Sequence, residues 1–237
     1  MFKTVKQNKA YQDVVEQIQE AIMEGSLKPG SQLPAERELK EQFGVSRGTL
    51  REALRVLEQK GLIEIRTGVA GGSIIREVNS EKLSENLGLL IRNRLVSLRD
   101  LAEFREGMEG GVAALAATRA SEQDLTALHD LLTVAEGHLN EGRKGWDEFV
   151  RTDEQIHMSL ARMSGNQLFI TVLESVYCNI HIYYENYLPW GKALLLENFK
   201  DLQDIVAAVS ARDAERAREA AQGHVRRFNA YMEEKQT

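Results

Sequence analysis

The sequence predicts a mainly α protein: an N-terminal winged helix-turn-helix followed by an all-α helical bundle. Residues 33–78 read as two short helices around a tight turn and then two strands joined by a glycine-rich tip. From about Asn79 onward, apolar residues recur only at helical intervals of three and four. The 237 residues are enough for two cores. We therefore predict two domains, residues 1–78 and residues 79–237.

The first three helices of the chain follow from apolar spacing and from their end signals. Apolar residues from Tyr11 to Ile22 stand at helical spacing, and Gly25 ends that helix. Pro34 fits the first turn of a second helix, where a missing N–H costs nothing. That helix runs to Phe43, and Gly44 breaks it.

The third helix has the pattern of a helix that reads DNA. Ser46 is placed to cap it, so it begins at about Arg47. Leu50, Leu54 and Leu57 form one apolar stripe, which leaves other faces to polar residues near the N-terminal end. Those polar-face residues are Arg47, Gly48, Thr49, Arg51 and Arg55.

These residue types suit contact with a DNA groove. Arginine pairs bidentately with guanine, threonine meets a thymine methyl or a phosphate, and glycine permits close approach of the helix. Strands over 62–66 and 73–78, joined by the flexible tip 67–72, would form a wing. An ordinary helical pair with solvated arginines explains the helices alone. The order of helix, turn, arginine-led helix and glycine hairpin favours DNA binding.

The run PAERELKEQFGVSRGTLREALRVLEQKGLIEIRTG resembles the DNA-binding domain of the GntR family of bacterial transcription regulators, and the likeness covers almost all of residues 10–78. The resemblance implies that Arg37, Arg47 and Arg51 contact double-stranded operator DNA. Thr49 and the wing residue Gly68 would assist, while Gly48 allows the close approach.

Charge and composition are consistent with a two-domain cytoplasmic regulator. The net charge is −6, but residues 1–78 hold 12 Lys and Arg against 11 Asp and Glu, so the acidity belongs to the second half. DNA affinity must then come from local arginines and from dimerisation. Cys178 is the single cysteine, so no intrachain disulfide can form. We find no signal-like N-terminus and no apolar run long enough to cross a membrane.

The second half is predicted to contain seven helices, with a loop at Gly142 to Gly145 and a turn at 164–166. The predicted helices are Glu81 to Asn93, Leu98 to Arg119, Glu122 to Asn140, Gly145 to Met163, Gln167 to Tyr187, Lys192 to Ala211 and Ala214 to Glu233. Asn79-Ser80 and Ser121-Glu122 have the sequence of helix caps.

This half resembles the all-helical ligand-sensing FCD domain of the FadR-like branch of the same family. The matching segments are LAEFREGMEGGVAALAA, DEQIHMSLARMSGN and IVAAVSARDAERAREAAQGHV. The resemblance implies a homodimer whose bundle binds a small metabolite, commonly a carboxylate, and transmits that binding to the DNA-binding domains.

A metal site is a second expectation. Asp153 and His157 are four residues apart, so on a helix they share a face, and His224 could supply a third ligand. An intrahelical pair between the carboxylate and the imidazole is the simpler alternative. Many FCD domains hold a divalent ion with one Asp and three His, and the resemblance puts the missing histidine at Leu202. Zinc or nickel could still bind through three ligands and an open position, with lower affinity.

Arg105 and Asn166 are the candidates for effector binding. Arg105 lies in a mostly apolar helix, where a buried cation needs a partner. That partner is either an internal carboxylate such as Glu109 or the carboxylate of an effector, held bidentately. Four tyrosines between 177 and 187 could line the same pocket, or belong to the core. Asn166 is either a turn residue or a pocket contact.

The sequence therefore predicts a homodimeric transcriptional regulator, a repressor, whose operator affinity responds to a small organic acid. A metal-responsive or ligand-independent DNA binder is the alternative, and a metal-dependent hydrolase is a distant third. No nucleophile motif or phosphate-binding glycine loop supports an enzyme.

Overall fold

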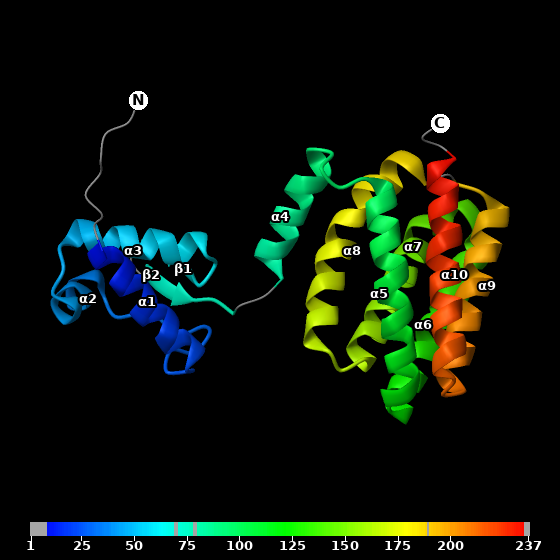
Figure 1. Ribbon diagram of the computed structural model, residues 1–237, viewed down its shortest axis with the longest axis horizontal. Helices are drawn as coiled ribbons and strands as arrows, with labels where there is room; N and C mark the ends of the chain where they lie inside the picture. The colour runs from blue at the N-terminus through cyan, green and yellow to red at the C-terminus, as the bar shows by residue number, and fades with distance from the viewer. Residues whose placement is uncertain (1–8, 69–70, 78–79, 189, 235–237) are drawn as a thin grey trace. The chain divides into compact units, whose positions relative to one another are not determined.

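The computed structural model describes residues 9–68, 71–77, 80–188 and 190–234 (Figure 1). The chain divides into two compact units between Lys82 and Leu83. The predicted domain boundary, between Val78 and Asn79, falls on two residues outside the described part. The elements are α1 (Lys9–Met23), α2 (Glu36–Phe43), α3 (Arg47–Gln59), β1 (Ile63–Arg66), β2 (Gly72–Ile75), α4 (Glu81–Arg92), α5 (Leu98–Arg119), α6 (Glu122–Glu141), the 3₁₀ helix η1 (Gly142–Gly145), α7 (Trp146–Met163), α8 (Gln167–Tyr187), α9 (Lys192–Ser210) and α10 (Ala214–Glu233).

The first unit is a winged helix-turn-helix. Helix α3 packs against α1 and α2, and its leucine stripe lies in the core with the apolar residues of α1. Gly44 adopts a left-handed conformation with φ of 64° and ends α2. Ser46 accepts a hydrogen bond from the Thr49 N–H and so caps α3, as predicted. The turn that aims α3 is therefore fixed by local sequence.

The boundaries differ from the prediction at α2 and at the wing. Helix α2 begins at Glu36 rather than Pro34, because Ala35 is extended (ψ 147°) and its carbonyl accepts the first helical hydrogen bond. The strands pair antiparallel with Ile63 opposite Ile75, and they span four residues each. The predicted end of the second strand, Val78, lies outside the described residues.

The base of the wing is tied to the segment before α2. Gln32 pairs with Ile74 across an isolated β-bridge, and its side-chain amide donates to the Gly71 carbonyl at 3.0 Å. Gly72 leaves the room for this contact, since a Cβ there would lie 2.0 Å from Gln32 Nε2. The glycine thus permits a direct link between the wing and the chain leading into α2.

The second unit is a helical bundle in which α10 packs along α5 and α9, while α6 packs against α7 and α9 (Figure 1). Ser121 caps α6 in a capping box with Asp124, as predicted, and Ser97 and Asp100 form the same motif at α5. The predicted loop over Gly142 to Gly145 is instead η1. No helix among the described residues is both long enough and apolar enough to cross a membrane.

The mostly apolar core of the bundle buries several polar side chains, and its ionisable ones gather in one group with two tyrosines. This group, here called the central polar cluster, comprises Arg105 and Glu109 from α5, Asp153 and His157 from α7, Tyr177 and Tyr184 from α8, Asp201 from α9 and His224 from α10. Each member is buried. Because burying polar groups is costly without partners, the contacts within this cluster make it the candidate functional site of the second unit.

Candidate functional site

The N-terminal end of α3 and the wing form one exposed face of the first unit. Arg47, Gly48 and Arg51 are exposed, and Thr49 is half-buried, with its hydroxyl 2.8 Å from that of Ser46. Leu50 and Leu54 on the opposite side are buried in the core. The amphipathic pattern therefore places the predicted DNA-contacting residues of α3 toward solvent.

A cleft of about 660 Å³ separates α3 from the wing. Arg51 lines one side and Gly68, at φ 106°, lines the other, together with Thr67. The Gly71 N–H donates to the Gly68 carbonyl at 2.9 Å. Arg37 is exposed on α2. The structure thus brings the recognition helix and the wing to the same opening.

Glu36, which the sequence analysis did not single out, holds the two arginines of α3. Its carboxylate accepts hydrogen bonds from Arg51 Nε at 3.0 and 3.3 Å, and Arg47 Nε lies 3.5 Å away. All three side chains are substantially exposed. Exposed ion pairs contribute little to stability, so the main consequence of this contact is that it fixes the orientation of the Arg51 side chain.

Glu36→Gln is expected to raise non-specific DNA affinity by about 1.5- to 5-fold, which corresponds to the roughly 0.2–1 kcal/mol of an exposed ion pair. The substitution removes a negative charge beside the phosphates and releases Arg51 from its orientation. The ratio of specific to non-specific affinity should fall. Fluorescence anisotropy with one operator and one scrambled duplex measures both, and an unchanged ratio would contradict the orienting role.

Arg105 is the arginine of the central polar cluster, with 2 % of its surface exposed. Its Nε donates to Glu109 Oε1 at 2.6 Å. Its two terminal nitrogens donate to the hydroxyls of Tyr177 at 3.1 Å and Tyr184 at 3.3 Å. The internal partner considered for Arg105, Glu109, is therefore present, and all three guanidinium nitrogens are engaged.

Two histidines and one aspartate meet beside this ion pair. His157 Nδ1 lies 2.6 Å from Glu109 Oε2, and His157 Nε2 lies 4.0 Å from Asp153 Oδ2. His224 approaches the same aspartate from α10, with Nε2 3.4 Å from Oδ1. The two rings stack with centroids 4.9 Å apart. The structure thus brings together the three residues predicted to bind a metal.

Burial and charge pairing set the ionisation of the cluster. Burial alone raises the pKa of Glu109, but Arg105 and His157 lower it by more, so it stays well below its usual range. Burial lowers the pKa of Arg105, yet Glu109 raises it well above normal. Burial likewise lowers the pKa of His157, and the adjacent Glu109 reverses the effect. Glu109 and Arg105 are therefore a charged pair at neutral pH.

The donor set suits a divalent ion. One ligand atom from each of Asp153, His157 and His224 lies within 4.8 Å of the others. Asp153 Oδ1 and His157 Nε2 are buried without a hydrogen-bond partner among the described residues. Imidazole and carboxylate are common ligands of zinc, at about 2.0–2.2 Å. Ligand atoms bound to one zinc ion lie closer to one another than 4.8 Å, so the three side chains would move inward on binding. Leu202 is fully buried in the apolar core.

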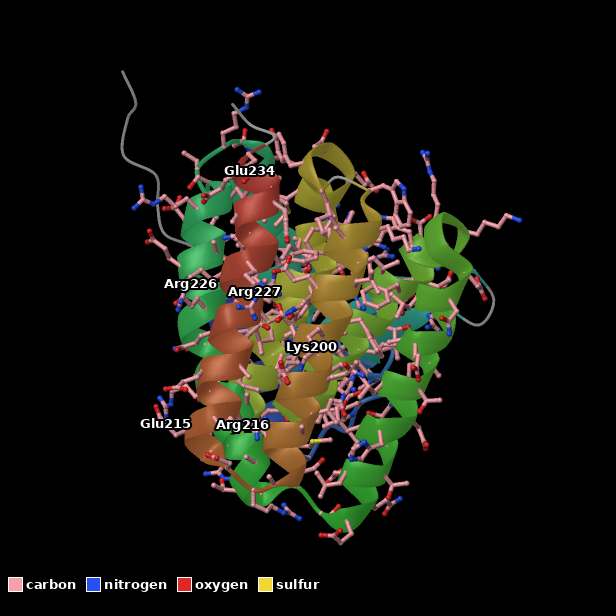
Figure 2. All side chains as sticks on the ribbon, turned by 90° about the vertical axis from the view of Figure 1, so that its right-hand side faces the viewer. Lys200, Glu215, Arg216, Arg226, Arg227 and Glu234 are labelled. Atoms are coloured by element: carbon pink, nitrogen blue, oxygen red, sulfur yellow. The ribbon has the colours of Figure 1, made fainter. Side chains whose placement is uncertain are left out.

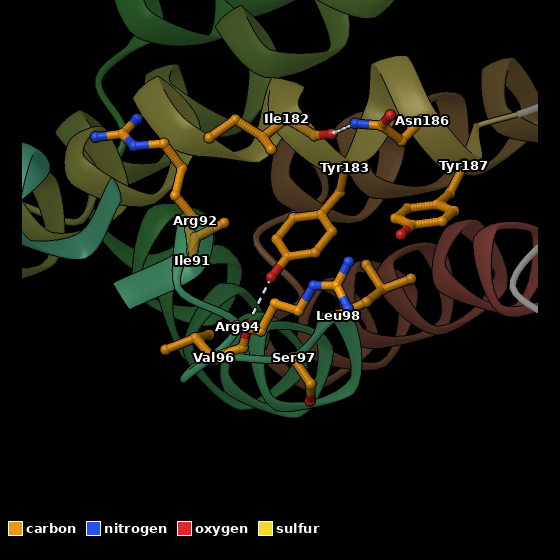
Figure 3. Close-up of a pocket in the computed structure, with 10 residues that line it drawn as sticks. All are labelled: Ile91, Arg92, Arg94, Val96, Ser97, Leu98, Ile182, Tyr183, Asn186 and Tyr187. Carbon is orange, nitrogen blue, oxygen red and sulfur yellow. Dashed lines mark hydrogen bonds between the residues drawn. The ribbon is translucent and has the colours of Figure 1, made fainter. Parts of the chain in front are cut away.

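Asn166 is the N-cap of α8, where its side-chain oxygen accepts a hydrogen bond from the Leu168 N–H at 3.0 Å. This is the role of a turn residue, and a contact with an effector stays a prediction. Another opening of about 610 Å³ lies beside α8 (Figure 3). Arg92 and Arg94 line it, and Tyr183 there donates to the Val96 carbonyl at 2.7 Å.

Asp201 and Arg227 also belong to this site and were missed in the sequence. The Asp201 carboxylate accepts a hydrogen bond from Arg227 Nε at 2.8 Å, and its Oδ2 lies 3.7 Å from His224 Nδ1. Arg227 projects from the middle of α10, next to Arg226 (Figure 2). Arg227 stands three residues after His224, one helical turn along the same helix, and this spacing was the available signal.

Two family models match different parts of the chain. Residues 10–71 match the family described as "Bacterial regulatory proteins, gntR family", and residues 100–227 match the FCD domain. The chain is 33% identical over 160 residues to the HTH-type transcriptional regulator LutR of Bacillus subtilis, covering 65% of this chain and 68% of that protein. It is 26% identical over 231 residues to the Uxu operon regulator of Haemophilus influenzae, covering 92% and 80%.

Among solved structures, "Streptococcus agalactiae GntR" superposes with a TM-score of 0.73 at 25% identity, covering 93% of this chain and 99% of that one. The winged unit with its exposed arginine-led helix and the helical unit with its buried polar cluster thus match the two family domains in order. The chain belongs to the GntR family of bacterial transcriptional regulators and carries an FCD domain behind its DNA-binding domain.

Proposed function

We propose that this GntR-family regulator is a cytoplasmic homodimeric repressor of a short, roughly palindromic operator. Its affinity for the operator changes when a small organic acid binds in the helical unit. The observation that carries the proposal is that one unit exposes an arginine-led helix beside a wing, while the other unit buries a cluster of arginine and histidine side chains. The first supplies a DNA-reading face, and the second supplies groups that bind carboxylates.

On the DNA side, Arg47 and Arg51 read base edges in the major groove, with Arg37 and Thr49 on the flanking backbone. Gly48 adds no side chain at the start of α3. A Cβ there would meet only the Ser46 hydroxyl oxygen, at an ordinary contact distance of 3.8 Å, so the fold itself does not require glycine at this position. Gly68 brings the wing backbone close to phosphate or the minor groove. The cleft lined by Arg51 and Gly68 supports this arrangement.

Arg51→Ala or Arg47→Ala is expected to weaken specific operator binding by about 1–3 kcal/mol, because each arginine would lose a bidentate contact to guanine. Operators selected from a random pool of duplex DNA by the full chain serve as the probe. Arg99→Ala is the matched control, since Arg99 is an exposed, ion-paired arginine on α5. Unchanged affinity in both α3 variants would overturn the recognition helix.

On the effector side, we propose that the organic acid is received by Arg105. Asn166 caps the start of α8, about three helical turns before Tyr177, so it lies too far along the helix to share that ligand. The terminal guanidinium nitrogens now bond to two tyrosine hydroxyls, which are neutral partners that a carboxylate can displace. Glu109 keeps Nε and holds the guanidinium in place. The effector would then act by shifting the population between states of different operator affinity.

A divalent ion, zinc or nickel, is the proposed cofactor, held by Asp153, His157 and His224. When bound, it would supply an electrophilic centre with an open coordination position for the acid. Arg105 and the two tyrosines place a cation and two hydroxyls beside that centre. This combination favours a metal-chelating carboxylate over a simple monoacid.

The homodimer is supported by apolar side chains left exposed on the second unit. Leu89 and Leu90 of α4 are 53% and 42% exposed, and Phe104 of α5 is 39% exposed. Beside them lies an apolar groove of about 400 Å³ between α4, α5 and α8. Patches of this kind mark interaction sites in proteins that stay in solution.

The whole proposal is tested by operator binding in the presence of a panel of hydroxy-, keto- and dicarboxylic acids, with and without added zinc. An acid that changes operator affinity of the native chain but not of Arg105→Lys supports it. If zinc alone changes operator affinity and no acid does, the regulator is metal-responsive instead. If neither acts, the ligand-independent reading holds.

A further inference from the structure

We propose that Glu109 and Asp201 are positioning residues that each hold the outer nitrogen, Nδ1, of one histidine, so that both Nε2 atoms face Asp153 as ligand atoms. The inference rests on the metal site of the proposed function. It adds two arginine–carboxylate–histidine chains, Arg105 with Glu109 and His157, and Arg227 with Asp201 and His224.

The first chain begins at the buried end of the site. Arg105 Nε donates to one Glu109 oxygen at 2.6 Å, and the other Glu109 oxygen lies 2.6 Å from His157 Nδ1. The carboxylate thus lies between a permanent cation and an imidazole, although Glu109 Oε2 forms no hydrogen bond of normal geometry among the described residues. Since an ionised carboxylate can only accept hydrogen bonds, the proton of the pair belongs on Nδ1 of His157. Its Nε2 lies toward Asp153 without a hydrogen-bond partner among the described residues, so it is the ring nitrogen available to a metal.

The second chain repeats the same order of groups on two other helices. Arg227 of α10 donates from two nitrogens to the Asp201 carboxylate of α9 (Figure 2). Asp201 Oδ2 then lies 3.7 Å from His224 Nδ1, which is beyond hydrogen-bond distance and leaves that nitrogen without a partner among the described residues. The proposal requires the two side chains to approach when the metal binds. His224 Nε2 lies on the other side of the ring, 3.4 Å from Asp153 Oδ1.

The two chains converge on one point. Both histidines turn Nδ1 toward a carboxylate that an arginine holds, and both turn Nε2 toward Asp153. Without a metal, the alternatives are two imidazolium cations or a single imidazolium at His157, whose pKa burial lowers but the adjacent Glu109 raises by more. Ring centroids only 4.9 Å apart put two such cations in close repulsion inside the core. A divalent ion binds histidine as neutral imidazole, so both rings must be deprotonated at Nε2 when the metal is bound.

Outer carboxylates of this kind usually orient the ring of a metal-bound histidine, set its tautomer and raise its basicity. At this site the effect matters more, because Leu202 stands where the family resemblance expects another histidine. With three protein ligands in place of four, the metal affinity depends more strongly on the correct orientation of each imidazole ring. Glu109 and Asp201 therefore compensate in part for the missing ligand.

The first test reads the tautomers directly. The full chain, labelled with ¹⁵N in its histidines and loaded with Zn²⁺, is examined by two-bond ¹H–¹⁵N correlation. We expect both His157 and His224 to show a protonated Nδ1 and a metal-bound Nε2. Coordination through Nδ1 in either ring would overturn the assignment of its carboxylate.

The second test measures Zn²⁺ affinity by competition with a chromogenic chelator. Glu109→Gln and Asp201→Asn are each expected to weaken Zn²⁺ binding by about 10- to 100-fold, as outer-sphere partners commonly do. Glu106→Gln and Asp204→Asn are matched controls on the same two helices, because both carboxylates form ion pairs at the surface. Affinity in both test variants equal to that of the controls would overturn the proposal.

Failure of the inference and failure of the metal site are distinguishable. If the native chain binds no Zn²⁺, the metal part of the proposed function is wrong, and the metal-free protein is examined at a pH where the imidazoles are neutral. Protonated Nδ1 in both rings still supports the positioning roles, and protonated Nε2 overturns them. Asp201→Asn guards against misfolding of Glu109→Gln, since Asp201 and its partner Arg227 lie nearer the surface.

Discussion

Replacing Arg105 with methionine is expected to destabilise the helical unit by about 3–5 kcal/mol, because removal of one partner leaves the buried Glu109 carboxylate without its cation. Arg105 and Glu109 are each only 2% exposed at the side chain. The free energy of unfolding is measured by urea denaturation, with α-helical circular dichroism as the signal, since the second unit is helical.

A second substitution separates this charge effect from lost packing. Arg105→Met combined with Glu109→Gln should recover much of the lost stability, because the uncompensated charge is gone. Arg105→Lys keeps the charge but cannot bond to Glu109, Tyr177 and Tyr184 together. We expect it to fold and to lose the response to the acid. A loss of less than about 1 kcal/mol in Arg105→Met would contradict the buried ion pair.

Joint replacement of His157 and His224 by alanine is expected to abolish divalent metal binding, from about one ion per chain to none. Two of three proposed ligands are lost, and Asp153 alone is a weak site. Elemental analysis of untagged, unchelated protein gives the count. His129→Ala with His181→Ala is the matched control, since both of these histidines are exposed.

Equal metal content in the two double variants would place the ion elsewhere. An absence of metal from the native chain, even after incubation with Zn²⁺ or Ni²⁺, would mean that replacement of a ligand by Leu202 has ended metal binding. The effector would then be recognised by Arg105 and its neighbours directly.

The recognition helix could be predicted from sequence because its determinants are local. The glycine that ends α2, the serine that caps α3 and the leucine stripe all act within a few residues of one another. The predicted start of α2 at Pro34 was early by two residues, because proline fits both the first helical turn and the extended residues before it. The residue at which a helix begins depends on which backbone groups of the preceding segment form hydrogen bonds elsewhere.

The contacts that organise the sites could not be predicted in this way. Glu36 and Arg51 lie 15 residues apart on two helices, and Asp201 and Arg227 lie 26 apart. Their pairing depends on how each of the two helices is rotated about its axis. Apolar spacing shows which face of a helix is buried, but it does not fix this rotation closely enough to pair individual side chains. Within a single helix the spacing sufficed, as for Arg105 with Glu109.

The contact between Gln32 and the wing has a consequence for how operator preference can change. Gln32 occupies the space that any side chain at position 72 would need, so a larger residue there must expel it and break its bond to Gly71. The base of the wing is thus coupled to the strand-like segment that leads into α2. A substitution at the tip, around Thr67, leaves this contact in place. A side chain at position 72 breaks the Gln32 contact, while the backbone hydrogen bonds of Leu33 and Ile75 still hold the base of the wing to the same segment.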